Sequence, residues 1–380
     1  MKNKHLYVLI SLPFFLEFSF HSNRQLPIAL SIESNSSSNA VGGQILQIDG
    51  NLQIERDGRR ITPNPGTNVY PQDRLIAANG GEAIVQCLDN TLSIQSVTHQ
   101  TRLLANCSTT SATESECEPG IVECTPRGDE LLWDETKIPY IISPHRTRLL
   151  DPNPIFRWNS VGENVSYQVS LLENGREIWS SGAEAISVTE IQYPGQDLAP
   201  GKNYALEVYA SNGSSSFDTP KLPAEMGVTL LDETEAAEVR ELADQIQNSA
   251  LNEDAKALAV SQLYLDRMLV AEALIKLDSV VERGTENAAI YRRVGEIYWR
   301  YLGIAPAAKD YYYRALSQIQ ENNLEEESKI LYELGNIEAS LQDYSRAIEL
   351  LIDAKTKYTN LGNLEKAEEL RVQLDRLSQR

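Results

Sequence analysis

The chain has 380 residues, of which 42% are hydrophobic, and this is enough for two to four domains with cores of their own. Its formal net charge of −20 argues against a nucleic-acid partner, because binding to a phosphate backbone requires a basic face. Acidity of this degree favours solubility without indicating a particular ligand.

The first 31 residues predict a secretory signal. Lys2 and Lys4 precede an apolar run from Leu6 to Leu16, and this run is shorter than the about 20 apolar residues that cross a bilayer. The small residues of Ala29-Leu30-Ser31 offer a cleavage site, but they lie well past the run. A cleaved signal and an uncleaved N-terminal anchor are therefore both open, and either predicts export. A Ser/Asn-rich linker, residues 32–40, follows.

The four cysteines of the chain lie upstream of the helices predicted below, which is typical of disulfides formed outside the cytosol. They allow three pairings, and we favour the pairing of sequence neighbours, Cys87 with Cys107 and Cys117 with Cys124. A metal site is not favoured, because the sequence has no C-x-x-C pair and its histidines are scattered.

Residues 41–107 predict an all-β domain of short strands separated by turn signals. Asp57-Gly58 predicts a hairpin, and Asn79-Gly80 a further turn. The order of Gly43, Tyr70 to Leu75 and Asp89 resembles the FecR-like periplasmic domain, although Gln72 stands where that family has glycine. The resemblance implies a bacterial envelope and a sensing or docking role. Asp73 and Asp89 are interpreted as turn residues in preference to catalytic acids.

Residues 108–137 read as a polar, acidic linker that a disulfide between Cys117 and Cys124 would close. Its one large apolar group, Leu131-Leu132-Trp133, is expected to dock on a neighbouring domain.

Residues 138–218 predict a second β-module. Phe156 and Trp158 share one face of a strand, and Asn174-Gly175 predicts a two-residue hairpin. The stretch from Leu198 to Tyr204 carries the L-x-P-G-x-x-Y pattern of a tyrosine corner, and here the sequence resembles a fibronectin type III domain. Another β-sandwich remains the alternative. Such a module spaces and presents its neighbours, and residues 219–231 would link it to the helices.

Residues 232–380 predict helices. Asp232 with Glu235 marks the start of a lead-in helix that runs through Ile246, and Leu364 to Leu377 has the charged, amphipathic pattern of a terminal capping helix.

Between these ends, Leu331 to Ala354 predicts two antiparallel helices that touch at Gly335 and Ala347, with Gln342 to Tyr344 as their turn. Tyr291 to Ala315 repeats the order with one extra turn residue, and Asn252 to Gly284 repeats it more weakly. Ser261 replaces the glycine in that weaker unit, and Glu338 stands at an aromatic position of the pattern. The region resembles the tetratricopeptide repeat family, and an unrelated helical bundle is the alternative.

The fold class expected is therefore multidomain β plus α: two small all-β modules followed by an all-α solenoid. The resemblance implies a groove lined by the first helix of each repeat. The positions that it assigns to the groove are Arg292, Glu296, Trp299, Arg300, Tyr332, Asn336, Gln262 and Asp266. Arginines beside aromatic residues are typical of binding hot spots. The alternative is that Trp299 packs between repeats and that Arg292 and Arg300 pair with nearby acids.

Catalytic motifs are missing from the sequence. It has no G-x-S-x-G, no H-E-x-x-H and no G-x-G-x-x-G, and the loop from Gly195 to Lys202 departs from the phosphate-loop spacing. The function predicted is a non-enzymatic protein of the periplasm or cell envelope, without cofactor or metal, that binds a protein or peptide partner. The alternative is a sensing component that acts through the FecR-like domain.

Overall fold

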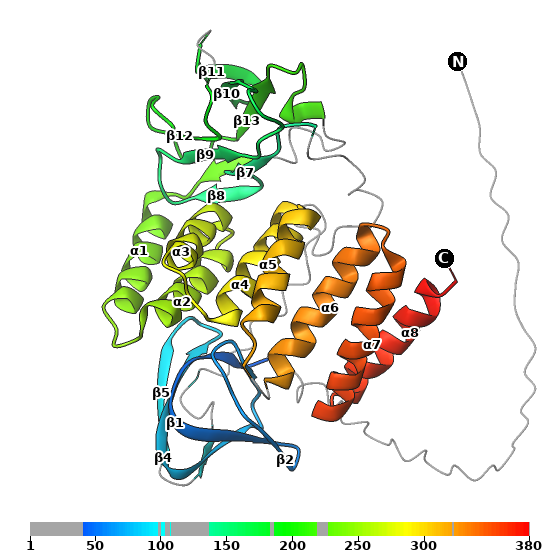
Figure 1. Ribbon diagram of the computed structural model, residues 1–380. Helices are drawn as coiled ribbons and strands as arrows, with labels where there is room; N and C mark the ends of the chain where they lie inside the picture. The colour runs from blue at the N-terminus through cyan, green and yellow to red at the C-terminus, as the bar shows by residue number, and fades with distance from the viewer. Residues whose placement is uncertain are drawn as a thin grey trace, which may run out of the picture. The chain divides into compact units, whose positions relative to one another are not determined.

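The computed structural model describes residues 41–97, 100–102, 107, 137–182, 186–218, 227–320 and 323–379 (Figure 1). The predicted signal, the linker 32–40, the Cys117–Cys124 pair and the group Leu131 to Trp133 lie outside the described residues.

Residues 43–102, the first β region, form one antiparallel sheet with the order β2-β1-β4-β5, in which β3 also pairs with β1 and β6 with β4. Its strands are β1 (Gly43–Arg56), β2 (Arg59–Ile61), β3 (Asn68–Val69), β4 (Arg74–Cys87), β5 (Leu92–Val97) and β6 (Gln100–Arg102). Asp57 and Gly58 have φ values of 49° and 75°, as a two-residue hairpin turn requires, so the predicted hairpin is confirmed.

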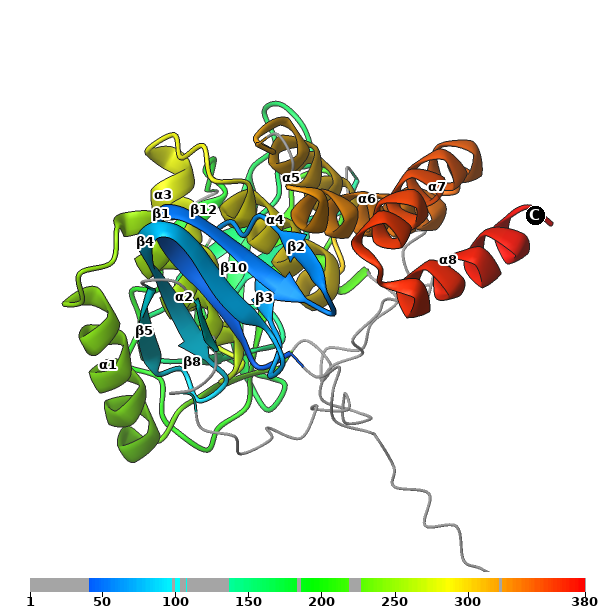
Figure 2. The ribbon, with the colours of Figure 1, turned by 90° about the horizontal axis from the view of Figure 1, so that it is seen from below.

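The prediction of a turn at Asn79-Gly80 is wrong, because these residues lie inside β4. Gly80 has a φ of 81° and Gly50, on β1, has a φ of 93°, which glycine adopts without strain. The pairing of β1 with β4 shifts register between Gly50 and Leu52. The glycines thus form a bulge in two long strands, which Figure 2 shows side by side.

Cys87, the last residue of β4, is bonded to Cys107 with a Cα–Cα distance of 5.5 Å, which confirms this predicted disulfide. Asp89 accepts hydrogen bonds from the backbone N–H and the hydroxyl of Thr91, at 3.0 and 2.6 Å, as a turn residue does.

Residues 141–230, the second β region, form two sheets with the orders β11-β10-β13-β14-β8 and β12-β9-β7. The strands are β7 (Ile141–Ser143), β8 (Thr147–Leu149), β9 (Ile155–Trp158), β10 (Tyr167–Glu173), β11 (Arg176–Ser180), β12 (Glu190–Gln192), β13 (Tyr204–Ala210) and β14 (Val228–Leu230), with a 3₁₀ turn η1 (Ser216–Asp218). Phe156 and Trp158 of one sheet share a buried core with Val169 and Val208 of the other. This is a β-sandwich.

Local features of the sandwich follow the sequence. Asn174 and Gly175 have φ values of 50° and 78°, and the Tyr204 hydroxyl accepts a hydrogen bond from the Ala199 backbone N–H at 2.9 Å. The segment predicted as a linker needs a correction, because β14 lies in it and pairs with β13 and β8.

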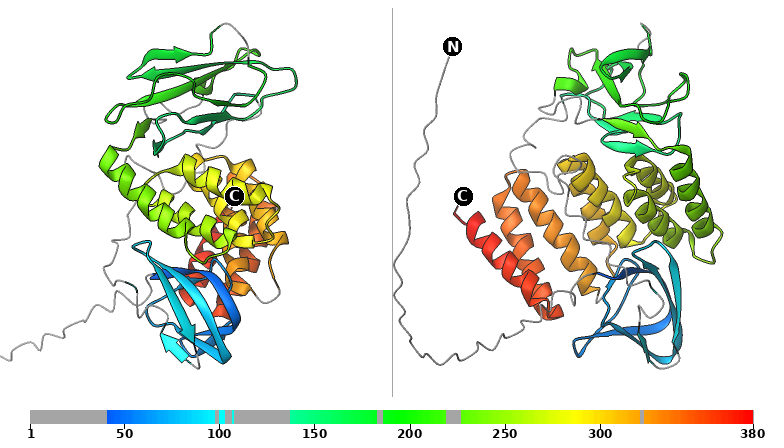
Figure 3. Two further views of the ribbon diagram at one scale, coloured as in Figure 1. Left: turned by 90° about the vertical axis from the view of Figure 1, so that its left-hand side faces the viewer. Right: turned by 180° about the vertical axis from the view of Figure 1, so that it is seen from behind.

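The helical region consists of α1 (Glu233–Gln247), α2 (Glu253–Leu265), α3 (Val270–Glu282), α4 (Ala288–Glu296), a π-helical segment η3 (Ile297–Leu302), α5 (Ala305–Ser317), α6 (Leu324–Ser340), α7 (Tyr344–Leu361) and α8 (Leu364–Leu377). Figure 3 shows them following one another in chain order. Asp232 accepts from the Glu235 N–H at 2.9 Å and so caps α1, and α8 has the limits predicted. None of the described helices is long and apolar enough to span a membrane.

The hairpins α2–α3, α4–α5 and α6–α7 fit tetratricopeptide-like repeats. A Cβ atom on Gly335 would lie 2.6 Å from Leu351 Cγ, and one on Gly295 would lie 2.8 Å from Tyr312 Cδ2. Ala347 and Ser261 are fully buried. The predicted contact at Gly335 is therefore confirmed, and the reason is that only glycine lets the helices approach this closely.

The extra residue of the α4–α5 unit was predicted in the turn, but it lies within the first helix. There the helix widens to the π-helical turn η3, which accommodates one more residue and ends at Gly303 with a φ of 72°. The turn of the next unit lies one residue earlier than predicted, because α6 ends at Ser340 and Tyr344 already belongs to α7, which Asp343 caps.

Candidate partner-binding cleft

The first β region packs against the first helix of each repeat. Gln86 Nε2 donates to the Ala259 carbonyl of α2 at 3.0 Å, and the Asn68 N–H donates to Glu325 of α6 at 3.2 Å. Arg293 of α4 donates to Gln44 at 3.3 Å. Leu46 and Ile84 of the sheet belong to the same buried apolar cluster as the helices. The face predicted to be an open groove is thus partly covered by the chain itself.

Arg56, at the end of β1, connects the sheet to α6. Its guanidinium donates to both carboxylate oxygens of the fully buried Asp73, at 2.9 and 2.8 Å, and to Glu325 at 3.2 Å. It also lies 4.4 Å from the ring centre of Tyr70. Burial opposes the charge of Arg56, but the hydrogen bonds to Asp73 and the charge of Glu325 outweigh burial and raise its pKa.

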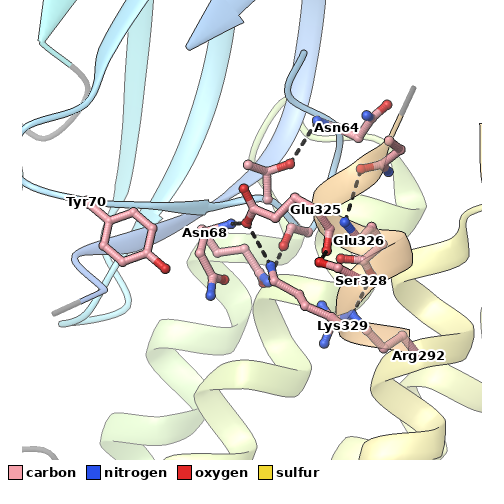
Figure 4. A network of polar contacts seen from close by, with 12 residues as sticks. Asn64, Asn68, Tyr70, Arg292, Glu325, Glu326, Ser328 and Lys329 are labelled. Carbon is pink, nitrogen blue, oxygen red and sulfur yellow. Dashed lines mark hydrogen bonds and ion pairs between the residues drawn. The ribbon is translucent and has the colours of Figure 1, made fainter. Parts of the chain in front are cut away.

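Glu325, in the first turn of α6, is the shared acceptor of this network (Figure 4). It receives the Asn68 N–H and the Arg56 guanidinium, and Lys329 Nζ lies 2.9 Å from its Oε1. Burial alone would raise the pKa of this carboxyl, yet the charges of Lys329 and Arg56 hold it below its ordinary value. The contact between sheet and helix is therefore ionic at neutral pH.

A second ionic network joins α4, η3 and α6. Glu296 lies 3.6 Å from both Arg292 and Arg293 and 4.0 Å from Arg300. Arg292 pairs in addition with Glu326, and Arg300 with Glu333. Although burial disfavours the charge of Glu296, the three guanidinium groups lower its pKa. These arginines are thus held by acids of the same chain.

Arg59, just after the hairpin turn, makes a separate contact with the corner between α7 and α8. It packs against Gly362, whose φ is 82°, and its Nη1 donates to the Asn360 carbonyl at 3.2 Å. The β1–β2 hairpin therefore touches α6 through Arg56 and the α7–α8 corner through Arg59.

Between these two contacts lies a cleft of about 620 Å³, which we call the composite cleft. It is lined by Arg56, Asp57, Arg59, Asn68, Tyr70, Gln72, Arg292, Glu296, Arg300, Tyr312, Glu325, Lys329, Tyr332, Glu333, Tyr358, Leu361, Gly362, Asn363, Leu364, Glu365 and Lys366. Lys366 Nζ lies 4.2 Å from the ring centre of Tyr332. Neither serine, cysteine nor histidine occurs in this lining, and no group among the described residues could hold a metal ion. The lining presents charged groups and aromatic rings to a ligand.

Four of the predicted groove residues, Arg292, Glu296, Arg300 and Tyr332, line the composite cleft. Trp299 does not, because the π-helical turn carries it into the helical core, where it is 4% exposed. Its predicted place in the groove is thus corrected to the core position that the sequence left as the alternative.

The remaining predicted groove residues have partners elsewhere. Asn336 accepts a hydrogen bond from Gln373 of α8 at 2.6 Å. Gln262 bonds to Asp266 at 2.7 Å, and Asp266 accepts from Asn90 of the first β region at 3.0 Å. Whether any of the predicted residues binds a partner stays a prediction.

The lining residues that the sequence prediction missed include Arg56, Arg59 and Tyr70 of the first β region, and Glu325, Lys329 and Lys366 of α6 and α8. A signal was present, since Arg56, Arg59 and Arg60 surround the hairpin turn in an otherwise acidic chain. It indicates a basic hairpin, but not the helices that the hairpin contacts.

No protein-family model matches the chain, and no curated protein does either. Among solved structures, the chain is similar to a crystal structure of MamA protein at 20% sequence identity and a TM-score of 0.27, over 38% of this chain and 76% of that one. A second crystal structure of MamA gives 18% identity and a TM-score of 0.26, over 39% and 96%. BtubC from P. vanneervenii gives 18% identity and a TM-score of 0.27, over 38% and 72%.

Proposed function

We propose that this protein is a non-enzymatic scaffold that binds another protein through the composite cleft. The observation that carries the proposal is that arginines and tyrosines from the first β region and from the helices converge on one cleft. Arginine and tyrosine are enriched at the energetically dominant positions of protein interfaces. A partner would thus contact a surface that neither the sheet nor the helices provide alone.

The finer domain assignments are part of the proposal. The two-sheet topology and the Tyr204 corner support a fibronectin type III-like module in the second β region. For the first β region, a FecR-like module is supported by the order of its hairpin and of the Tyr70 to Asp73 turn. The limits predicted for these modules stay predictions.

Export to the periplasm or cell envelope is also proposed. The Cys87–Cys107 disulfide supports an oxidising compartment, and the basic and apolar N-terminal segment supports secretion. Fractionation of the native host, with mass spectrometry of the cysteines, tests this. A cytosolic pool with free thiols would contradict export.

The experiment for the scaffold function uses photo-crosslinking in the native host. A photoreactive phenylalanine replaces Asp57 of the hairpin or Tyr332 of α6, which lie on different walls of the cleft. As control it replaces Tyr209, which is 51% exposed on β13 of the second β region. We expect the same protein to be captured from positions 57 and 332 and not from position 209.

Capture of the same protein from all three positions, or from none, would contradict the proposal. The alternative of a sensing component has no comparable observation in its favour, because Gln44, Asn68 and Gln86 of the first β region are bonded to the helices.

A further inference from the structure

We infer that the segment which the composite cleft receives is extended and acidic, and that Arg59 binds its carboxylate. The inference rests on the proposed function and specifies the chemistry of the partner.

Arg59 donates to a backbone carbonyl, whereas each of the other arginines of the cleft pairs with a carboxylate. Arg56 is paired with Asp73, Arg292 with Glu326 and Arg300 with Glu333. In the part of the chain that the structure describes, no carboxylate pairs with Arg59, and its guanidinium donates to the neutral Asn360 carbonyl. Arg59 is also exposed, so a ligand can reach it from solvent.

A carboxylate is a better acceptor for Arg59 than the carbonyl that it now contacts. A guanidinium matches a carboxylate with two parallel bonds and an opposite charge, whereas the Asn360 carbonyl accepts one bond and carries no charge. An acidic segment that enters at the α7–α8 corner would therefore replace one hydrogen bond of Arg59 by two and bring opposite charges together. Lys366, at the same corner, lies over the ring of Tyr332 and pairs with the exposed Glu369 at 2.8 Å.

The charges of the cleft permit such a ligand in a chain of net charge −20. The lining contains six arginine and lysine residues and five aspartate and glutamate residues. Three of those acids, Glu296, Glu325 and Glu333, are neutralised by cations at distances of 4.0 Å or less. The other two acids of the lining, Asp57 and Glu365, belong to the hairpin tip and to the first turn of α8.

The position of the cleft favours an extended segment. The hairpin contacts α6 through Arg56 and the α7–α8 corner through Arg59, and the cleft lies between these two contacts. Successive side chains of a strand point to opposite faces. An extended segment can therefore offer side chains to both walls of the cleft.

The inference is tested on the full chain with two fluorescein-labelled peptides of equal length, one alternating glycine with glutamate and one alternating glycine with glutamine. Fluorescence anisotropy is measured at about 0.15 M ionic strength, where exposed charges are screened beyond about 8 Å. We expect the glutamate peptide to bind at least about tenfold more tightly than the glutamine peptide. Arg59→Gln should remove that preference, and Lys366→Gln should reduce it.

Arg60→Gln is the matched control, because Arg60 is the neighbouring exposed arginine on β2 but is absent from the cleft lining. It should leave binding unchanged. Equal affinity for the two peptides, no binding of either, or the same loss in both arginine variants would overturn the inference. Crosslinking from positions 57 and 332 with no preference for glutamate would show that the cleft binds a protein of different chemistry. Failure of both experiments would remove the proposed function as well.

Discussion

The two β regions contact the same helices in different ways. The first β region uses charged groups that are far apart in sequence, such as Arg56 and Glu325 with a separation of 269 residues. The second is joined to them by chain continuity in addition to side chains: Thr147 Oγ1 accepts from the Val270 N–H at 2.9 Å, Arg157 pairs with Asp278 of α3 at 2.8 Å, and β14 leads through Leu231 to the Asp232 cap of α1. Among the described residues, the composite cleft lies at the contact of the first β region. We therefore expect a partner to bind at the contact between the first β region and the helices. The second β region is expected mainly to support the helices.

The largest effect should come from removing the cation at the first contact. Arg56→Ala leaves the fully buried Asp73 without its partner, and breaking a buried ion pair in this way costs about 3 to 5 kcal/mol. Hydrogen exchange of β1 and β4 in the full chain measures the loss. Arg60→Ala, an exposed neighbour, is the control, and an equal effect of both variants would show that the contact is not the source of stability.

The helices that both β regions share should be sensitive to packing. Gly335→Leu places a branched side chain where a single Cβ would already lie 2.6 Å from Leu351 Cγ, so we expect a loss of up to about 3 kcal/mol. Thermal unfolding followed by circular dichroism measures it. An unchanged midpoint would mean that α6 and α7 do not touch at this glycine.

The contact between the second β region and the helices contains a buried carboxyl, Glu272 of α3, that should make this contact less stable as pH rises. Burial raises the pKa of Glu272 from 4.5 to about 7, and this carboxyl accepts the Leu150 N–H at 2.6 Å. Because the folded state holds the proton more tightly, stability should fall as pH rises from about 4.5 to about 7. Glu272→Gln should abolish this slope and stabilise the chain by up to about 3 kcal/mol at pH above 7, the size of the pKa change at 1.36 kcal/mol per unit. Parallel pH profiles of wild type and variant would contradict the assignment.

The smallest effect should come from an ion pair of the second contact. Arg148 and Glu235 pair with side chains that are 35% and 28% exposed, and such pairs contribute less than about 1 kcal/mol. Arg148→Ala, measured in the same hydrogen-exchange experiment, should thus change little compared with Arg56→Ala. A loss as large as that of Arg56→Ala would remove the distinction between the two contacts.

Local features were predictable because each depends on residues close in sequence. The hairpins at Asp57-Gly58 and Asn174-Gly175, the Asp232 cap and the limits of α8 all follow from turn and helix-end preferences. Asn79-Gly80 shows the limit of that reasoning, since the same dipeptide forms a bulge when two long strands can pair through it.

The site was predictable only in part. The repeat pattern assigns Arg292, Glu296, Arg300 and Tyr332 to the concave face, and these residues do line the composite cleft. It could not assign Arg56 or Arg59, because no local pattern says which helix a distant hairpin contacts. Trp299 was misplaced for a different reason: the π-helical turn rotates the residues after Glu296, and repeat offsets assume a regular helix.

The bonds from the first β region to α2, α4 and α6 also have a mechanical consequence. In a free solenoid each repeat touches only its neighbours, so the array bends and unfolds step by step. Here one sheet is bonded to three successive repeats through Gln86, Gln44 and Asn68, and it therefore spans the two junctions between them. The sheet then restrains the curvature of the array. A force applied to α8 reaches α2 through the sheet as well as through the helices between them.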